Sequence, residues 1–255
     1  LTNFLLTPQV KGRLLGLTAT PGRSNSDDDL KLKSFFNEKV KLSVAGYSNP
    51  VTYLIDTGYL ARPKFISIAG INKEELDFSD EELLNLSTGK DFNVEQLTRI
   101  ANNAQRNLKI ILECEKIFKK HKRVMVFASS VDQSDALAAV LTSRGHNAVS
   151  VTKNTSEYDR EKFIEEFKKE DSDNKAIFNY GILTTGFDAP KTSAVVITRP
   201  TTSLVLYSQM VGRGLRGWKV GGNKESEVYT VIDDGLEQFR SIEKAFENWE
   251  GIWNE

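Results

Sequence analysis

The chain has 255 residues and a formal net charge of -1, with 39% hydrophobic and 27% charged residues. This composition is typical of a globular protein and excludes a collagen-like or a highly charged disordered chain. No apolar run approaches the ~18 residues that a membrane-spanning helix needs, and the N-terminus has no signal-peptide pattern. We therefore expect a cytoplasmic protein without membrane contact. The single cysteine, Cys114, excludes an internal disulfide, and we predict no metal site.

The first quarter of the chain predicts short elements. A strand is expected over 13–18, ending in a Thr-Ala-Thr-Pro-Gly turn, and a helix over 49–57 that Gly58 closes. The pattern breaks at 61–63, where we place the junction between a domain of residues 1–62 and a domain of residues 63–255. The acidic segment 72–95 is expected to be an exposed loop with a short helix.

The rest of the chain alternates strand-like and helix-like spacing of apolar residues. One long amphipathic helix is expected over 94–120. Further helices are expected from 132, 160 and 203, and at the C-terminus. Strands are expected over 64–69, 124–128, 147–152, 176–180, 194–198 and 228–233. This alternation predicts an α/β fold in which helices flank both faces of a parallel sheet.

Several small or polar residues directly follow predicted strands. Ser129 and Thr152 each come at the end of a strand, and Thr184 to Asp188 follow the strand over 176–180. Ligands of parallel α/β sheets bind at the carboxyl ends of the strands. We therefore expect these residues at one ligand-binding edge of the sheet.

The most informative stretch is Gln209-Met210-Val211-Gly212-Arg213-Gly214-Leu215-Arg216. Two arginines three residues apart lie on one face of a helical turn, where they can clamp a phosphate chain. The glycines at 212 and 214 are expected to let the backbone approach whatever the arginines hold. The alternative interpretation is a solvated basic helix end.

Two other blocks stand in a fixed order with this one: Leu15-Gly16-Leu17-Thr18-Ala19-Thr20-Pro21-Gly22-Arg23 and Ile182-Leu183-Thr184-Thr185-Gly186-Phe187-Asp188-Ala189-Pro190. Together the three blocks resemble motifs III, V and VI of the superfamily 2 DEAD/DEAH-like helicases and translocases. The residues in these blocks are most similar to those of the branch that includes restriction-system translocases and XPB-like enzymes. The resemblance covers most of the chain, from about residue 14 to 234. It implies a RecA-like P-loop NTPase fold, with the end of a first motor domain followed by the second.

The resemblance also implies roles for individual residues. Arg213 and Arg216 would be arginine fingers, and Gln209 would position the γ-phosphate or its attacking water. Gly186 and Asp188 would face the nucleotide. The remaining residues would hold a nucleic-acid strand (Ser129, Thr152, Thr184) or couple nucleotide state to strand grip (Thr18, Thr20). The implied cofactors are ATP and Mg²⁺. The implied partners are nucleic acid, DNA rather than RNA, and restriction or repair subunits.

Two elements of a complete motor are missing from the sequence. A phosphate loop of the form G-x-x-x-x-G-K-[ST] is absent, because Gly89-Lys90 is followed by Asp91 and position 84 is Leu. No DExH box is found either. We expect a fragment of an ATP-dependent helicase that is inactive alone, with both elements upstream of Leu1. The alternative is a non-catalytic regulatory module that docks on another motor and donates its arginines in trans.

A third interpretation is a dinucleotide-binding enzyme. Residues 212–217 also spell G-x-G-x-x-G, a fingerprint that must open a helix directly after a strand. Gly217 instead leads into the loop-like sequence over 218–223, which disfavours this interpretation.

Overall fold

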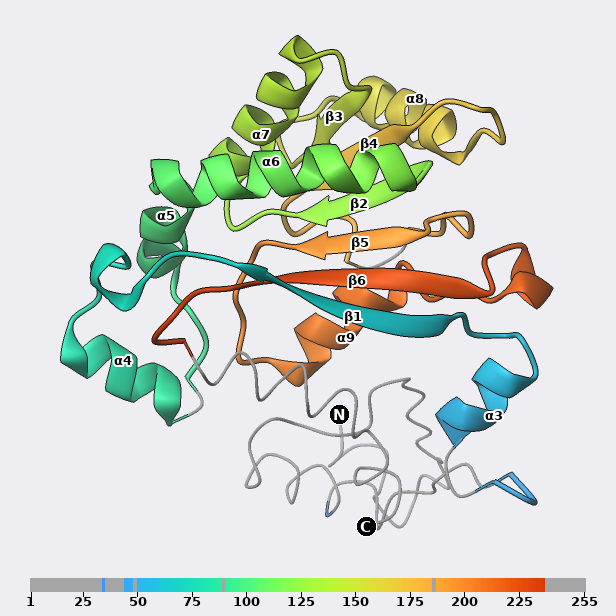
Figure 1. The fold of residues 1–255 in the computed structure, drawn as a ribbon, viewed down its shortest axis with the longest axis horizontal. Helices are drawn as coiled ribbons and strands as arrows, with labels where there is room; N and C mark the ends of the chain where they lie inside the picture. Colours follow the sequence, from blue (N-terminus) through green and yellow to red (C-terminus); the bar gives the residue numbers. More distant parts are fainter. Residues whose placement is uncertain (1–33, 35–43, 48–49, 89, 185–186, 237–255) are drawn as a thin grey trace, which may run out of the picture.

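The computed structural model describes residues 34, 44–47, 50–88, 90–184 and 187–236. Six parallel strands of this part form one sheet in the order β1-β6-β5-β2-β4-β3 (Figure 1). The strands are β1 (Arg62–Ala69), β2 (Arg123–Phe127), β3 (Ala148–Val151), β4 (Lys175–Asn179), β5 (Ala194–Ile197) and β6 (Glu225–Ile232). The predicted α/β fold with a parallel sheet is confirmed.

The central strands are short and mostly apolar, with polar residues only at their ends: Arg123, Lys175 and Asn179. Every residue of β2, β4 and β5 is buried. A strand covered by helices on both faces cannot alternate apolar and polar residues, because both sets of side chains face a core. This explains why Arg123-Val-Met-Val-Phe127 and Ala194-Val-Val-Ile197 form strands in the middle of the sheet.

Helices cover both faces of the sheet, with α6 in front of it and α9 behind it in Figure 1. One face packs against α6 (Ala104–Lys120) and α7 (Val131–Ser143), through Ile110, Phe118 and Leu137. The other packs against α8 (Glu157–Lys168) and α9 (Leu204–Gly212), through Phe167 and Tyr207. None of the helices in the described ranges is long and apolar enough to cross a membrane.

The single helix expected over 94–120 is wrong. The segment forms two helices, α5 (Val94–Asn102) and α6, with extended backbone at Asn103 between them (φ -70°, ψ 111°). The Asn103 side chain accepts a hydrogen bond from the amide of Arg106 at 2.9 Å. An asparagine that caps a new helix offers the backbone an alternative to continuing the old one, and the apolar periodicity does not reveal this competition.

The expectation of an exposed loop over 72–95 is also wrong in part. The segment holds a 3-10 turn (Lys73–Glu75) and α4 (Asp80–Ser87), whose N-terminus Ser79 and Glu82 cap reciprocally. Its acidic side chains are largely exposed, but its apolar residues form a third small core. The buried members of this core are Ile71, Leu76, Leu86, Phe92, Leu97, Ile100 and Leu236.

The helix expected over 49–57 is present as α3 (Pro50–Asp56), and Gly58 after it has φ +80°. Val51 and Leu60 pack against the core under α8 and α9. The strand expected from residue 64 begins at Arg62, so the proposed break at 61–63 lies at the start of β1. The strand expected over 13–18 and the C-terminal helix lie outside the described residues. The division of the chain at residue 62 stays a prediction.

Candidate functional site

The register of the sheet brings the ends of four strands to one edge. Phe127 of β2 lies opposite Asn179 of β4 and Ile197 of β5, and Val151 of β3 lies opposite Asn179. The segments that follow these residues therefore leave the sheet together. This row of strand ends, called the carboxyl edge below, contains Ser129, Thr152, Tyr180 and Arg199.

Ser129 lies at the carboxyl edge but faces inward. It is fully buried, its hydroxyl donates to the carbonyl of Thr198 at 3.1 Å, and its amide donates to Gln133 Oε1 at 2.7 Å. The neighbouring Ser130 caps α7 instead, accepting from the Gln133 amide at 3.0 Å. The Ser129 hydroxyl and amide therefore already have partners in α7 and in the segment after β5, and its expected contact with a nucleic-acid strand stays a prediction.

The hydroxyls of Thr152 and Thr184 also form local hydrogen bonds. Thr152 is buried, and its hydroxyl accepts a hydrogen bond from the amide of Asn154 at 3.3 Å. The Thr184 hydroxyl donates to the carbonyl of Gly181 at 3.3 Å, and Thr184 is 9% exposed. Thr152 shapes a turn at the carboxyl edge and Thr184 shapes a turn in the segment after β4, and their expected contacts with a nucleic-acid strand stay predictions.

Arg213 is the C-cap residue of α9 and contacts the turn that holds the second motif. Its Nη2 donates to the carbonyl of Thr184 at 2.8 Å, and its Nη1 donates to the carbonyl of Phe187. Its Nε is buried without a hydrogen-bond partner. Burial, followed by the charge of Arg216, lowers the pKa of Arg213, although a guanidinium stays charged in proteins. Among the ion pairs of the described residues, none includes Arg213.

Arg216 lies beyond the helix, because α9 ends at Gly212. It forms an isolated bridge with Leu60, and its Nε donates to Asp188 Oδ1 at 3.0 Å. The two side chains of this pair are 44% and 61% exposed. The expectation that Arg213 and Arg216 share one face of a helical turn is wrong. Gln209 is instead the residue that lies one helical turn from Arg213, and it is half-buried.

The glycines of the motif differ in their surroundings. A Cβ on Gly214 would lie 2.6 Å from Val195 Cγ2 and 3.0 Å from Ser226 Oγ. Gly214 is therefore needed for close packing of the chain on the sheet. A Cβ on Gly212 would meet nothing within 4 Å. Because Val195 and Ser226 stand near the starts of their strands, this turn lies over the amino-terminal half of the sheet, away from the carboxyl edge.

Three predicted residues have no structural description. Gly186, Thr18 and Thr20 lie outside the described residues. The run over 212–217 follows a helix and leads into a 3-10 turn (Trp218–Val220), which is not the strand-to-helix context of a dinucleotide fingerprint.

The candidate site contains no metal cluster or reactive thiol in the described ranges. No group of three or more His, Cys, Asp or Glu side chains is placed to hold a metal ion there. Cys114 is completely buried, and burial raises the pKa of its thiol to about 12. It is a small core residue, packed among the apolar side chains between α6 and the sheet.

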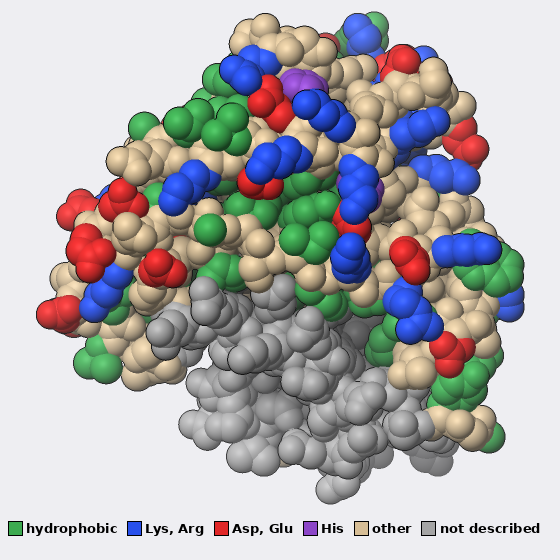
Figure 2. Space-filling model, viewed as in Figure 1, with side chains coloured by type: hydrophobic (Ala, Val, Ile, Leu, Met, Phe, Trp, Pro, Cys, Tyr) green, Lys and Arg blue, Asp and Glu red, His purple; other side chains and the backbone are tan. Residues whose placement is uncertain are grey.

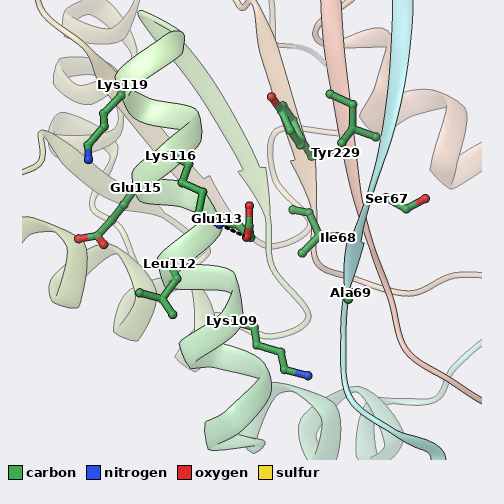
Figure 3. A pocket seen from close by; sticks show the side chains of 11 residues that line it. Ser67, Ile68, Ala69, Lys109, Leu112, Glu113, Glu115, Lys116, Lys119 and Tyr229 are labelled. Carbon is green, nitrogen blue, oxygen red and sulfur yellow. Dashed lines mark hydrogen bonds and ion pairs between the residues drawn. The ribbon is translucent and has the colours of Figure 1, made fainter.

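A groove of about 580 Å³ lies between α6 and β1, away from these residues. Figure 3 shows Leu112 and Ile68 along it, with Lys109, Lys116 and Glu113 from α6 at its rim. In Figure 2 the same face shows apolar side chains beneath a row of lysines and arginines. No residue predicted for the site lines this groove.

The central part of the chain matches a known protein family. Residues 104–217 match the family described as helicase conserved C-terminal domain. A candidate ATP-dependent helicase of Saccharomyces cerevisiae, IRC3, is 30% identical over 213 residues, which are 82% of this chain and 28% of the yeast protein. The chain contains the C-terminal domain of a superfamily 2 helicase. The helicase C-terminal domain thus includes α6 to α9 and the Arg213 motif.

Two further proteins are similar to this chain, one in sequence and one in fold. A 51.5 kDa protein of a Lactococcus phage (isolate 7-9) is 26% identical over 205 residues, 79% of this chain and 40% of its own length. The chain therefore spans less than half the length of either curated relative. A candidate HsdR subunit of a type I restriction enzyme from Vibrio vulnificus YJ016 has the same fold, with a TM-score of 0.59 at 20% identity. That match covers 89% of this chain and 40% of the Vibrio chain.

The sequence pattern did not single out three polar groups of the described residues. Arg106 of α6 and Asp233 after β6 form a fully buried ion pair at 2.9 Å. Asp91 accepts hydrogen bonds from the Thr201 hydroxyl at 2.9 Å and from the Thr202 amide at 2.9 Å. Arg199 stacks on Tyr180, with 5.1 Å from its Cζ to the ring centre. Tyr180, Arg199 and Asp233 had a signal in the sequence, since each directly ends or follows a predicted strand.

Proposed function

We propose that this chain is the second motor domain of an ATP-dependent nucleic-acid helicase or translocase, and that it supplies arginine fingers to ATP bound on a first domain. The observation that carries this proposal is the state of Arg213. It is a half-buried cation that two backbone carbonyls hold in place, and no carboxylate of the described residues lies within ion-pair distance of it. A fixed cation without a counter-ion is suited to stabilise charge that develops on a transferring phosphoryl group.

Arg216 and Asp188 support a second part of the proposal. Their ion pair is largely exposed. Arg216 could therefore exchange the Asp188 carboxylate for a phosphate oxygen as its partner at a small cost in lost hydration. We propose that Asp188 holds Arg216 ready until the cleft closes on ATP. Gln209, one turn before Arg213, would orient the γ-phosphate or the attacking water. Gly186 would let the backbone approach the nucleotide. Thr18 and Thr20 would couple the state of the nucleotide to the grip on the nucleic-acid strand.

ATP and Mg²⁺ enter this proposal through the other domain. Since the described residues hold no carboxylate cluster fit for a metal ion, Mg²⁺ would be bound by the ATP phosphates and the first domain. Residues 1–62 would be the end of that domain and 63–255 the second. A cytoplasmic location and DNA as the bound strand belong to the same proposal, as does a restriction or repair partner. The fold shared with the Vibrio protein favours such a partner.

The test is ATP turnover by the natural full-length protein. Arg213→Gln should lower kcat by about 10³-fold or more, because arginine fingers act mainly in the transition state. The Kd for ATP should change little. Arg144→Gln is the matched control, since it removes the same charge from an exposed arginine paired with Glu115 far from the motif. The present chain alone should hydrolyse no ATP.

Three results would contradict the proposal. One is robust hydrolysis by the 255-residue chain. Another is an Arg213→Gln variant whose turnover equals that of Arg144→Gln. A third is an equal loss of ATP affinity and turnover, which would indicate uniform binding and not transition-state stabilisation. If the chain stimulates a separately supplied motor domain, it acts in trans, and the regulatory-module interpretation replaces the intact motor.

A further inference from the structure

Helix α6 exposes large apolar side chains to solvent. Leu108 is 57% exposed and Leu112 is 45% exposed, and the two lie one helical turn apart. The inward side of the same helix is already used, because Ile110 and Phe118 pack in the core against the sheet. Single exposed leucines are common on protein surfaces, but neighbouring ones beside an apolar groove are typical of an interaction site.

Leu112 also lines the groove between α6 and β1, called the α6 groove below, which has a volume of about 580 Å³ (Figure 3). β1 is the outermost strand of the sheet, and its Ile66 lies opposite Tyr229 of β6. Both of these residues line the groove together with Ile68. The α6 groove therefore has apolar side chains both on its helix wall and on its sheet wall.

Lysines line the α6 groove along one side of α6. They are Lys109, Lys116 and Lys119. The ion pairs within the described ranges include none for Lys109, whose Nζ donates to the carbonyl of Gly70, and none for Lys119. The glutamates that line the groove already have partners: Glu113 pairs with Lys116 and Glu115 pairs with Arg144. The charge that is left without a counter-ion at this groove is therefore positive.

An α-helix fits the α6 groove better than an extended segment does. The lining positions of α6 run from 109 to 119, which is about 15 Å of helix. β1 and β6 pair along the whole of β1, so the sheet wall offers side chains and not backbone donors or acceptors. An extended segment lying on it would bury amides and carbonyls without partners, which costs free energy for each group. A helix satisfies these groups internally.

We propose that the α6 groove binds an amphipathic α-helix of a partner protein. The apolar side of that helix packs on Leu112 and Ile68, and a flank rich in Asp and Glu lies beside Lys116 and Lys119. A helix in a groove is recognised through apolar residues at positions i, i+3, i+4 and i+7, and the lysines select an acidic flank over a basic one.

This docking site is independent of the proposed function. α6 and α9 cover opposite faces of the sheet (Figure 1), and Arg213 directly follows α9. A helix in the α6 groove therefore leaves the arginine motif uncovered.

The test uses the 255-residue chain and three fluorescein-labelled peptides. The first peptide is about 14 residues long, with leucine at positions i, i+3, i+4 and i+7 and glutamate at the flanking positions. The second has lysine in place of glutamate, and the third has the composition of the first in scrambled order. Fluorescence anisotropy should show the first peptide binding at least about tenfold more tightly than the other two. Its affinity should fall as salt is added.

An apolar variant locates the binding. Leu112→Glu should weaken binding of the first peptide about tenfold or more, because it places a charge in the apolar wall of the groove. Leu84→Glu is the matched control, since it changes an exposed leucine of α4, outside the groove, and should leave the Kd unchanged. Thermal unfolding of each variant shows whether it is folded.

A charge reversal tests the acidic flank. Lys116→Glu/Lys119→Glu should reverse the preference, so that the lysine peptide binds more tightly than the glutamate peptide. Lys162→Glu/Lys168→Glu is the matched control, because it makes the same change of charge at exposed positions of α8, on the other face of the sheet. The control should keep the preference of the wild type.

A wild-type chain that does not distinguish the three peptides overturns the inference, as does a folded Leu112→Glu chain that binds like Leu84→Glu. Two other occupants of the groove would overturn it as well. If the wild type sediments as a dimer and Leu112→Glu as a monomer, the groove holds a second copy of the chain. If Lys116→Glu/Lys119→Glu weakens binding of oligothymidine and not of the peptides, the lysines serve a nucleic acid. The ATPase test of Arg213→Gln is separate from all of these outcomes.

Discussion

The buried pair of Arg106 and Asp233 should dominate the stability of the carboxyl edge. Both side chains are essentially unexposed, and Arg106 Nε lies 2.9 and 3.0 Å from the two carboxylate oxygens. Arg106 Nη2 donates to the carbonyl of Thr198 at 2.8 Å, and the amide of Ile71 donates to Asp233 Oδ1 at 3.0 Å. The pair therefore joins α6, β5 and the segments that follow β1 and β6.

The cost of breaking this pair can be worked out from these contacts. Asp233→Ala leaves the Arg106 guanidinium buried without a counter-ion, which costs about 3–5 kcal/mol. It also leaves the Ile71 amide without its acceptor, at about 1–3 kcal/mol. The sum of about 4–8 kcal/mol is comparable to the whole stability of an ordinary domain. Asp233→Asn keeps an acceptor for Ile71 and should cost less.

The assay is urea unfolding of the single variants and of the double variant Arg106→Met/Asp233→Asn. The double variant removes both buried charges, so it should be more stable than the sum of the two single losses predicts, with a coupling of about 1.5 kcal/mol or more. Arg144→Gln, which breaks an exposed pair, should change the midpoint little. A loss below about 1 kcal/mol for Asp233→Ala, or strict additivity in the cycle, would refute this reasoning.

Three further outcomes are expected. Gly217→Ala should cost about 1–3 kcal/mol in urea unfolding, because its Cβ would lie 2.2 Å from the carbonyl oxygen of Gly58, whereas Gly212→Ala, which meets nothing, should be close to neutral; equal effects would contradict the packing argument. Asp91→Ala should speed hydrogen exchange of the Thr202 amide and lower Tm, while Asp91→Asn should largely preserve both. Burial raises the pKa of Glu227, but hydrogen bonds, first from Lys120, lower it more, to about 2 from an ordinary 4.5. The ionised Glu227 thus stabilises the fold above about pH 4.5, and its contribution is lost as pH falls toward 2. The difference in Tm between the wild type and Glu227→Gln should therefore be largest near neutral pH and should shrink below pH 4.5. A difference in Tm that does not depend on pH would show that the ionised carboxylate does not stabilise the fold.

Much of the secondary structure could be predicted from the local sequence, because it depends on the spacing of apolar residues and on the composition of each segment. The runs at β2, β4 and β5 are short and apolar in their interiors, and the serine at 130 stands where a helix cap is needed. Secondary structure of this kind is decided within a few residues. The break at Asn103 escaped prediction because the apolar spacing continues through it, and only the cap hydrogen bond ends the first helix.

The motif around residues 209–216 was recognisable from sequence alone, and so were the α/β class and the edge at which the predicted strands end. Only the tertiary structure decided which way the side chains at that edge point. Ser129 faces inward because α7 and the segment after β5 supply its partners. Away from that edge, Arg216 forms an ion pair with Asp188, whereas none of the ion pairs of the described residues includes Arg213. Tyr180 and Arg199 meet across the end of β2 although they are distant in the chain. The physical reason is that periodicity reports which face of an element is apolar, whereas ion pairs and hydrogen bonds depend on which elements the sheet order makes neighbours.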